Sequence, residues 1–375
     1  MAKVKHVLGI SGGKDSAALA IYLNEKYPEL DIEYYFCDTG KELNETYELI
    51  EKLESLLGKP VKRLEAAKGS PEDTPFDHFL TAYGGYLPSS ISRWCTKKMK
   101  LEPFERYIAG DRPVISYVGI REDEDREGYI SKKPNVQSIF PFRRNIWSED
   151  VIKIALENSN IPILKKLYQE HAQESEKLKR MLEVVEEPLS THFSRSQKLD
   201  TLLELGVKFF NRAVFSLLKD LDYPIAHADT FPLIENEEGL IREDIFKKLR
   251  ESGVGVPAYY EKRAYEVQID GEMKTGYYSR SRSGCFFCFF QQKIEWVWLF
   301  ENHPSLFGKA KEYEKSGYTW QQGETLEELA LPERREQIKR EHFLRMERKR
   351  ANTQSDYLVD LLDEAEGEGC AACFV

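Results

Sequence analysis

A chain of 375 residues with 41% hydrophobic residues can build one large domain and a smaller one around a buried core. No apolar run approaches the roughly 20 residues that span a bilayer, and the first residues lead straight into a strand-like stretch rather than a signal peptide. We therefore expect a cytoplasmic protein with no membrane segment. The formal net charge of -10 argues against a broadly basic surface for nucleic acid, although a local basic face can exist on an acidic protein.

Strand-like and helix-like segments alternate in the N-terminal part of the chain. Strands are expected at 4–10, 32–37, 60–66 and 113–120, and helices at 15–27, 42–57 and 98–108. Strands that alternate with helices pair in parallel through right-handed crossovers. The pattern predicts a doubly wound α/β sheet that ends near Pro141, within a first domain of residues 1–145.

The rest of the chain is predicted to be mainly helical. Residues 146–275 are expected to form a substrate or partner region, with a highly charged stretch at 169–198 that is typical of a solvated helix or insertion. Residues 276–375 are expected to form a helical C-terminal region with a charged helix at 324–350 and two CxxC pairs.

A glycine-rich loop separates the first strand from the first helix. Its residues are Ser11, Gly12, Gly13, Lys14, Asp15 and Ser16. Glycines allow the backbone to approach phosphate oxygens, and the following helix directs unpaired N–H groups and a positive dipole at them. An ordinary strand-to-helix turn does not require two glycines, a cation, a carboxylate and two hydroxyls together, so we interpret the loop as a phosphate-binding site.

The spacing fits neither GxxxxGK[ST] nor GxGxxG. It resembles the PP-loop of the N-type ATP pyrophosphatases, in the adenine nucleotide α-hydrolase superfamily. Three further segments resemble the phosphoadenosine phosphosulfate (PAPS) reductase family, and the resemblance covers roughly residues 4–168. They are Asp38-Thr39-Gly40 with Glu42 and Glu45-Thr46, Arg93-Trp94-Cys95-Thr96-Lys97-Lys98 with Pro103, and Gly119-Ile120-Arg121 with Arg126.

The resemblance implies roles for individual residues. True PAPS reductases bind a ready-made adenylate and typically lack the Lys-Asp of this loop, so Lys14 and Asp15 point to ATP. Lys14 would stabilise charge on the α and β phosphates, and Asp15 would help to hold magnesium. Asp38 would contact the nucleotide or cap the next helix. Arg121 would form a fork onto phosphate oxygens, or belong to a solvated charged helix.

Cys95 is a candidate nucleophile. Its basic neighbours Arg93, Lys97 and Lys98 would lower the pKa of the thiol, and a thiolate can attack an adenylate, carry a persulfide or bind metal. The alternative is a small buried thiol. That interpretation is favoured for Cys37, which lies within an apolar strand.

Two CxxC pairs suggest a metal site. Cys285 and Cys288 offer one half of a four-thiolate site, and Cys370 and Cys373 offer the other, for zinc or an iron-sulfur cluster. A rival arrangement places Cys95 with Cys285 and Cys288 around a cluster, which resembles the iron-sulfur members of the PAPS reductase and DndC-type groups. A disulfide within each pair is a third possibility.

The resemblance and the thiols together predict an ATP-dependent sulfurtransferase that forms AMP and pyrophosphate. The nearest resemblance is to DndC-like proteins of DNA phosphorothioation, with nucleic acid, above all DNA, as acceptor and a cysteine desulfurase and other proteins of the system as partners. RNA thiolation is the next candidate reaction after DNA phosphorothioation. The alternative enzyme is a PAPS reductase-like or sulfate adenylyltransferase-like protein that acts on a small sulfur oxyanion or nucleotide. A non-enzymatic nucleotide sensor is the third class, against which the intact Lys14 and Asp15 argue.

Overall fold

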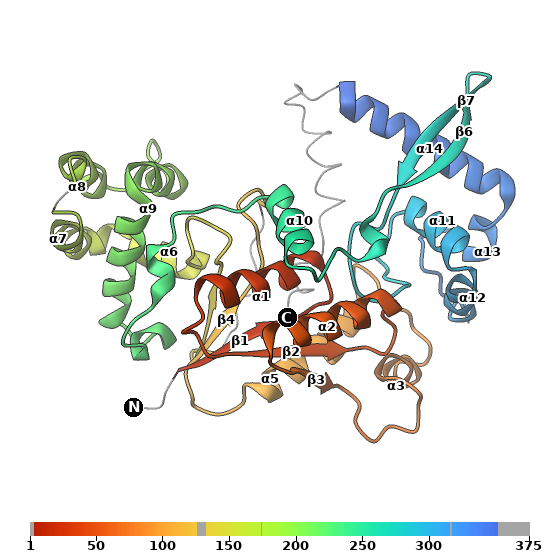
Figure 1. Ribbon diagram of the computed structural model, residues 1–375, viewed down its shortest axis with the longest axis horizontal. Helices are drawn as coiled ribbons and strands as arrows, with labels where there is room; N and C mark the ends of the chain where they lie inside the picture. The colour runs from red at the N-terminus through yellow and green to blue at the C-terminus, as the bar shows by residue number, and fades with distance from the viewer. Residues whose placement is uncertain (1–3, 126–132, 174, 316, 352–375) are drawn as a thin grey trace.

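A parallel β-sheet forms the centre of the molecule (Figure 1). The computed structural model describes residues 4–125, 133–173, 175–315 and 317–351. The five strands are β1 (Lys5–Gly9), β2 (Ile32–Asp38), β3 (Val61–Glu65), β4 (Val114–Tyr117) and β5 (Val136–Ile139), in the order β3-β2-β1-β4-β5. All four pairings are parallel, so the predicted parallel α/β sheet is confirmed.

The strand order reverses at β1. The chain runs outward from β1 through β2 to β3, and then returns to the other side of β1 for β4 and β5. His6 pairs with Ile32 of β2 on one side and with Ile115 of β4 on the other. In open α/β sheets, the loops after two such strands diverge and leave a crevice at the carboxyl ends. The segments after β1 and β4 therefore border the crevice in which a ligand is expected.

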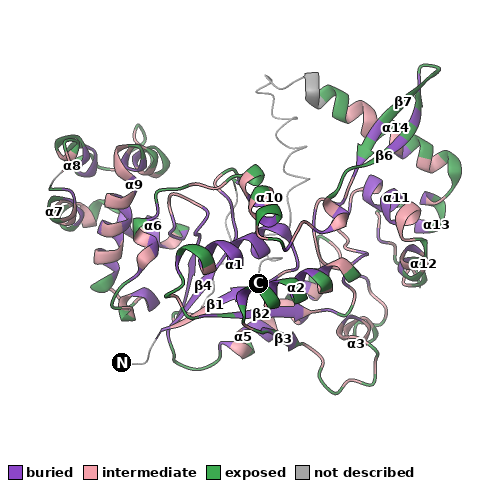
Figure 2. Ribbon diagram, in the orientation of Figure 1, coloured by how far each residue is buried: buried purple, intermediate pink, exposed green. Residues whose placement is uncertain are grey.

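Helices cover both faces of the sheet. One face carries α1 (Lys14–Lys26) and α2 (Asn44–Leu57), and α5 (Glu102–Tyr107) lies on the other (Figure 1). The first ten residues of α1 are all buried, because α10 (Arg242–Glu251) packs on the side of α1 that faces away from the sheet (Figure 2). On the opposite face, Phe104 of α5 stacks on Tyr35 of β2 with ring centroids 5.2 Å apart.

A helical region extends from one end of the sheet, on the left in Figure 1. Its helices are α6 (Glu149–Ala155), α7 (Ile161–His171), α8 (Leu178–Glu186) and α9 (Arg195–Lys219). A short helical turn at Asn158–Asn160 lies between α6 and α7, and further turns follow α9 at Pro224–His227, Pro232–Glu235 and Ala258–Tyr260. The apolar sides of α7, α8 and α9 share one hydrophobic core with the sheet and α1.

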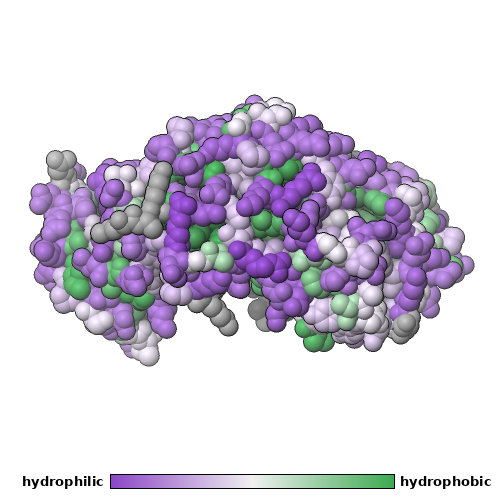
Figure 3. Space-filling view, turned by 90° about the horizontal axis from the view of Figure 1, so that it is seen from below, coloured by the Kyte–Doolittle hydropathy of each residue, from purple (hydrophilic) through white to green (hydrophobic). Residues whose placement is uncertain are grey.

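A second body extends from the opposite end of the sheet. It contains the hairpin β6 (Arg263–Ile269) and β7 (Glu272–Tyr278), then α11 (Lys293–Asn302), α12 (Pro304–Glu312), α13 (Leu326–Leu329) and α14 (Pro332–Ala351). The hairpin, which was not predicted, packs against α14 and crosses the expected boundary between residues 275 and 276. Hydrophilic residues cover most of the face in Figure 3, with apolar residues in small separate groups. No helix within the described ranges is long and apolar enough to cross a membrane.

An aromatic cluster joins this second body to the first domain. The segment between β3 and β4 forms α3 (Pro75–Ala82), α4 (Trp94–Thr96) and a π-helical turn at Lys97–Leu101. Phe76 of α3 lies 4.5 Å from the Phe287 ring and 5.4 Å from the Trp94 ring, and Phe287 stacks on Trp320 at 4.8 Å. The cluster thereby holds Cys95, the neighbour of Trp94, beside the CxxC segment that contains Phe287.

Candidate active site

The loop after β1 closes on itself. Ser16 accepts a hydrogen bond from the Ser11 amide at 3.1 Å and donates one to the Gly13 carbonyl at 3.2 Å. Gly12 has a φ of 74°, and a Cβ at this position would lie 2.2 Å from the methyl group of Thr46. Only glycine fits there, since both the backbone conformation and the space exclude a side chain.

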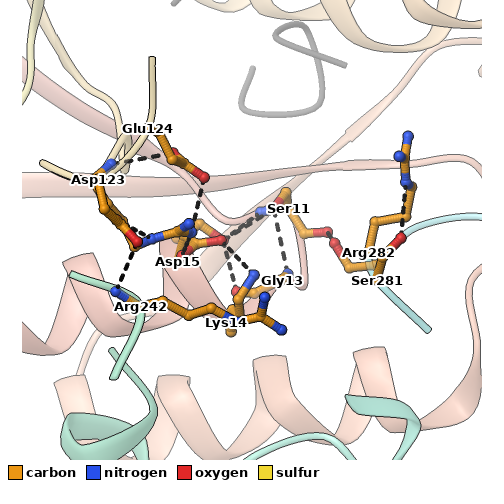
Figure 4. A network of polar contacts seen from close by, with 12 residues as sticks. Ser11, Gly13, Lys14, Asp15, Asp123, Glu124, Arg242, Ser281 and Arg282 are labelled. Carbon is orange, nitrogen blue, oxygen red and sulfur yellow. Dashed lines mark hydrogen bonds and ion pairs between the residues drawn. The ribbon is translucent and has the colours of Figure 1, made fainter. Parts of the chain in front are cut away.

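Lys14 and Asp15 begin helix α1 and form an ion pair. The Lys14 ammonium lies 3.0 Å from Asp15 Oδ2 (Figure 4). The Arg121 guanidinium lies 2.8 Å from Oδ1. Burial acts to raise the pKa of the Asp15 carboxyl, but the charges and hydrogen bonds of Lys14 and Arg121 together outweigh it and lower the pKa. Asp15 is therefore an ionised group that orients two cations at the helix N-terminus.

Arg121 reaches Asp15 because the loop after β4 approaches helix α1 closely. A Cβ at Gly119 would lie 3.1 Å from the Asp15 carbonyl oxygen, so the close approach favours glycine there. Arg121 also contacts Asp123 at 2.9 Å and Glu124 at 2.8 Å. Asp123 and Glu124, from the charged segment after β4, thus turn inward to the buried Arg121. Contact between Arg121 and a phosphate stays a prediction. Arg126 lies outside the described residues.

The C-terminal half of the chain covers the loop. The Tyr259 hydroxyl donates to the Gly12 carbonyl at 2.8 Å, and the Ser283 hydroxyl donates to the Ser11 carbonyl at 3.4 Å. The Lys14 ammonium lies 5.2 Å from the centroid of the Tyr260 ring. The sequence analysis missed these contacts, because nothing local to residues 259–283 indicates that they meet residues 11–14.

Asp38 and Thr39 shape the turn after β2. Asp38 accepts hydrogen bonds from the Gly40 amide at 2.8 Å and from the Tyr47 hydroxyl at 3.0 Å. Helix α2 begins after Leu43, which has no side-chain cap, so Asp38 closes its own turn instead of capping the helix. Contact between Asp38 and a nucleotide stays a prediction.

The turn after β2 lies against the first CxxC pair. The Phe286 amide donates to the Lys41 carbonyl at 2.9 Å, and Thr39 Oγ1 lies 3.2 Å from Cys285 Sγ. Burial raises the pKa of the Cys285 thiol well above its ordinary value, so this arrangement favours the protonated thiol. The CxxC pair is therefore adjacent to the turn after β2, close to the loop after β1.

Three cysteines line one pocket. Cys95, Cys285 and Cys288 surround a cavity of about 50 Å³. Cys37 does not line this pocket: it lies on β2 in the core, where burial raises the pKa of its thiol to about 12, and it borders the neighbouring pocket that Ser11 also lines. The prediction that Cys37 is a core thiol is confirmed.

The cysteines do not form a complete metal site within the described ranges. Among those residues, no group of three or more His, Cys, Asp or Glu side chains is arranged to hold a metal ion. Cys370 and Cys373 lie outside the described residues, so the four-cysteine site stays a prediction. The rival site of Cys95, Cys285 and Cys288 has its three thiols around one pocket, but not in a metal-binding arrangement.

A parallel sheet with a glycine-rich, lysine-containing loop at its switch point is typical of α/β proteins that bind nucleotides. Residues 5–209 match the phosphoadenosine phosphosulfate reductase domain. This match covers more than half of the chain, so the chain belongs to the phosphoadenosine phosphosulfate reductase domain family, whose members are enzymes of sulfur-related nucleotide chemistry.

Two proteins of Methanocaldococcus jannaschii are similar to the chain. Uncharacterized protein MJ0066 is 32% identical over 154 residues, which cover 38% of this chain and 30% of that protein. Uncharacterized protein MJ0973 is 29% identical over 149 residues, which cover 37% of this chain and 34% of that protein. The chain thus spans about a third of the length of these relatives.

One solved structure is also similar. It is the phosphoadenylyl-sulfate reductase from Candida auris in complex with phosphate, at a TM-score of 0.29 and 16% sequence identity. The match covers 40% of this chain and 67% of that one.

Replacing Arg121 with Met should lower the free energy of unfolding at neutral pH by about 3–5 kcal/mol, because buried carboxylates lose their cation. The folded-state pKa of Asp15 lies below its ordinary value of 3.8. Its contribution to stability is therefore present above that value and is lost as the pH falls through the folded-state pKa. The difference between wild type and R121M should shrink accordingly below about pH 4. Urea unfolding at a series of pH values measures both effects.

The matched control is Arg63→Met. Arg63 is half-exposed and lies 3.7 Å from Asp38, so its loss should cost about 0–1 kcal/mol. Equal, small losses in R63M and R121M would show that the Asp15–Arg121 pair adds nothing to stability.

Metal analysis tests the cysteine site. If Cys285 and Cys288 bind metal with Cys370 and Cys373, then C285S, C288S and a chain that ends at Gly369 should each lose metal and stability together, because ligand loss couples to folding. The measurement is metal content and thermal unfolding of anaerobically purified protein. A chain ending at Gly369 with full metal content would instead favour the arrangement that uses Cys95.

Proposed function

We propose that this chain binds ATP at Ser11–Ser16, cleaves it to AMP and pyrophosphate, and uses the adenylate to transfer sulfur. The observation that carries the proposal is the position of two neighbouring pockets. Ser11 lines the first pocket, at the carboxyl ends of β1 and β2, and Cys95, Cys285 and Cys288 line the second. Both pockets share Lys100 and Gly284 as lining residues. An adenylate formed beside the loop would lie next to the thiols.

The first step is adenylation. An acceptor oxygen attacks the α-phosphorus of ATP, the bond from that phosphorus to the bridging oxygen breaks, and pyrophosphate leaves. Backbone N–H groups at the start of α1 and the Lys14 ammonium would stabilise the charge that develops on the departing phosphates. Magnesium would spread the pyrophosphate charge, and Asp15 is its expected ligand; in the described arrangement, both carboxylate oxygens of Asp15 contact cations.

The second step replaces oxygen with sulfur. The terminal sulfur of a persulfide on Cys95, supplied by a cysteine desulfurase, attacks the activated centre, and AMP leaves with the acceptor oxygen, so that the acceptor is joined to Cys95 through a disulfide. A second thiol of the pocket, from Cys285 or Cys288, then attacks the Cys95 sulfur as its thiolate and releases the thiolated acceptor. The disulfide left between the two cysteines is reduced by an external thiol. Cys95 lies on α4, directly before the π-helical turn at Lys97–Leu101, a kind of turn that is frequent at functional sites. Its partly buried side chain lines the pocket.

The acceptor favoured by sequence resemblance is a nucleic acid, above all the DNA backbone in phosphorothioation. Arg93 and Lys97 are exposed beside Cys95, so their charges are accessible to a phosphodiester. A small sulfur oxyanion is the second candidate. Its supporting observation is a pair of buried arginines, Arg280 and Arg282, on the segment that leads to the CxxC pair.

Lys14→Ala should abolish pyrophosphate release from ATP and magnesium, with a loss of roughly 100-fold or more, because the cation at the phosphates is removed. The fold should persist, since Asp15 keeps its contact with Arg121. Lys26→Ala is the control, because Lys26 lies at the far end of the same helix and pairs with Glu238. Products are measured with the acceptor present. Formation of ADP and phosphate by the wild type would rule out the adenylation mechanism.

Cys95→Ser should still bind ATP and release pyrophosphate, because the nucleotide loop follows a different strand. It should fail to incorporate sulfur, since serine cannot carry a persulfide. Mass spectrometry of nucleic acid and of small oxyanion products, with a sulfur donor present, measures the transfer. Lys26→Ala serves as the control here too and should transfer sulfur normally, because Lys26 lies at the far end of α1 and pairs with Glu238. Normal transfer by C95S would remove Cys95 from the mechanism.

A further inference from the structure

The nucleotide loop is enclosed on both sides. Residues 12–16 are all buried, and Lys14, which has to reach the phosphates of a nucleotide, is 8% exposed. Figure 4 shows Asp123 on one side of the loop and Ser281, from the C-terminal half of the chain, on the other. The pocket that Ser11 lines has a volume of about 10 Å³, which is room for about one water molecule. A triphosphate therefore cannot reach the start of helix α1 unless part of this enclosure moves.

Three hydroxyl groups of the C-terminal half lie against the backbone of the loop. A Cβ at Gly13 would lie 2.7 Å from the Ser283 hydroxyl oxygen and 3.4 Å from the Tyr260 hydroxyl oxygen. The Tyr259 hydroxyl donates to the Gly12 carbonyl at 2.8 Å. These groups converge on the backbone that phosphate oxygens approach in a glycine-rich loop before a helix.

Tyr260 contacts both groups of Lys14 that are expected to bind phosphate. The centroid of its ring lies 5.2 Å from the Lys14 ammonium. Burial, together with the charge of Asp15, raises the pKa of the Tyr260 hydroxyl to about 12, and hydrogen bonds from the Lys14 amide and from Ser283 to the hydroxyl oxygen act against this rise. The Lys14 amide is the first N–H group of α1, one of the groups that helices leave unpaired and that bind phosphate oxygens. The Tyr260 oxygen thus accepts a hydrogen bond that a phosphate oxygen would accept.

A glycine-containing segment connects Tyr259 and Tyr260 to helix α10. Gly253 and Gly255 lie in this segment, with φ of 78° and 82°. Other residues rarely adopt such angles, and an added Cβ at either glycine would meet no atom within 4 Å. Hinges consist of a few loop residues that absorb changes in φ and ψ. The two glycines therefore allow the tyrosines to leave the loop while α10 stays packed on α1.

We propose that Tyr260 and Ser283 form a latch that keeps ATP out of the nucleotide loop until their contacts with Gly13 and Lys14 are released. The latch regulates the site to which we assign ATP, so it rests on the proposed function. Closed and open forms are in equilibrium, and only the open form admits the triphosphate. The measured affinity for ATP is then the affinity of the open form multiplied by the fraction of molecules that are open. A weakened latch therefore strengthens ATP binding.

The test is Tyr260→Phe in the full-length protein. Loss of one hydrogen bond of the closed form should raise the affinity for ATP by about two- to tenfold. Without nucleotide, the same variant should show faster hydrogen–deuterium exchange over residues 12–16, because the loop is open more often. The first effect is measured by calorimetry with magnesium and an ATP analogue whose α and β phosphates are joined by a methylene group. Mass spectrometry of the exchanged peptides measures the second.

Tyr22→Phe is the matched control. Tyr22 lies on the same helix, and its hydroxyl donates to Asn236 at 3.0 Å, away from the loop. Y22F should leave both the affinity for the analogue and the exchange of residues 12–16 unchanged. Ser283→Ala removes the other hydroxyl of the latch and should change both quantities in the same direction as Y260F.

Four results would overturn the latch. If Y260F binds the analogue more weakly than the wild type, Tyr260 contacts the nucleotide instead. If the wild type binds the analogue and Y260F binds it equally well, the contact does not limit access. Unchanged exchange over residues 12–16 in Y260F and S283A would show that the hydroxyls do not hold the loop closed. An equal rise in Y22F would assign the effect to a general loosening of α1.

The exchange measurement separates the latch from the proposed function, because it needs no nucleotide. Faster exchange in Y260F and S283A, with no binding of the analogue by any variant or by the wild type, would support the closure of the loop by Tyr260 and Ser283. It would at the same time count against ATP as the ligand of the loop, and so against the proposed function.

Discussion

The hydrogen bond from Tyr259 to the Gly12 carbonyl joins the C-terminal half of the chain to the loop after β1. The left-handed conformation of Gly12 makes this contact possible, because it forms the sharp turn in which that carbonyl is exposed to Tyr259. Ser283 extends the same contact to the Ser11 carbonyl. Neither the sheet nor the C-terminal body contains the whole candidate site, so the position of one against the other decides whether the loop after β1 and the thiols lie together.

Aromatic packing sets that position. Phe76, from the first domain, packs against Phe287 and Trp94, so residues far apart in the sequence share one core. Rings of this size bury large apolar areas and hold a defined geometry, which suits a contact that must place small groups accurately. Trp94 directly precedes Cys95, and Phe287 lies between Cys285 and Cys288. The same packing that attaches the second body to the sheet therefore also brings Cys95 to the CxxC pair.

The sequence predicted those parts of the structure that depend on neighbouring residues. The strand, loop and helix around residues 11–16 follow from local spacing. The position of Cys95 beside the CxxC segment depends on packing between residues nearly two hundred positions apart, so the sequence left several arrangements of the cysteines open. Arg121 was ambiguous because the acidic run around it fits a solvated helix equally well; only the approach of Asp15 decides that it is buried. Strand β5 has four residues, too few for a clear alternation. The hairpin did carry a usable signal: Asp270-Gly271, both with positive φ, is a typical two-residue hairpin turn.

The distribution of charge bears on what the site can admit. The chain as a whole carries a formal charge of -10. A polyanion would lie along much of this surface and meet repulsion from it, whereas a small ion interacts only with charges within about 8 Å in physiological salt. Near the loop after β1, the charges of Lys14 and Arg121 are balanced by Asp15, Asp123 and Glu124. Arg280 and Arg282, which have buried nitrogens without a hydrogen-bond partner, belong to the segment that covers this loop, where the low local dielectric strengthens any contact with an anion.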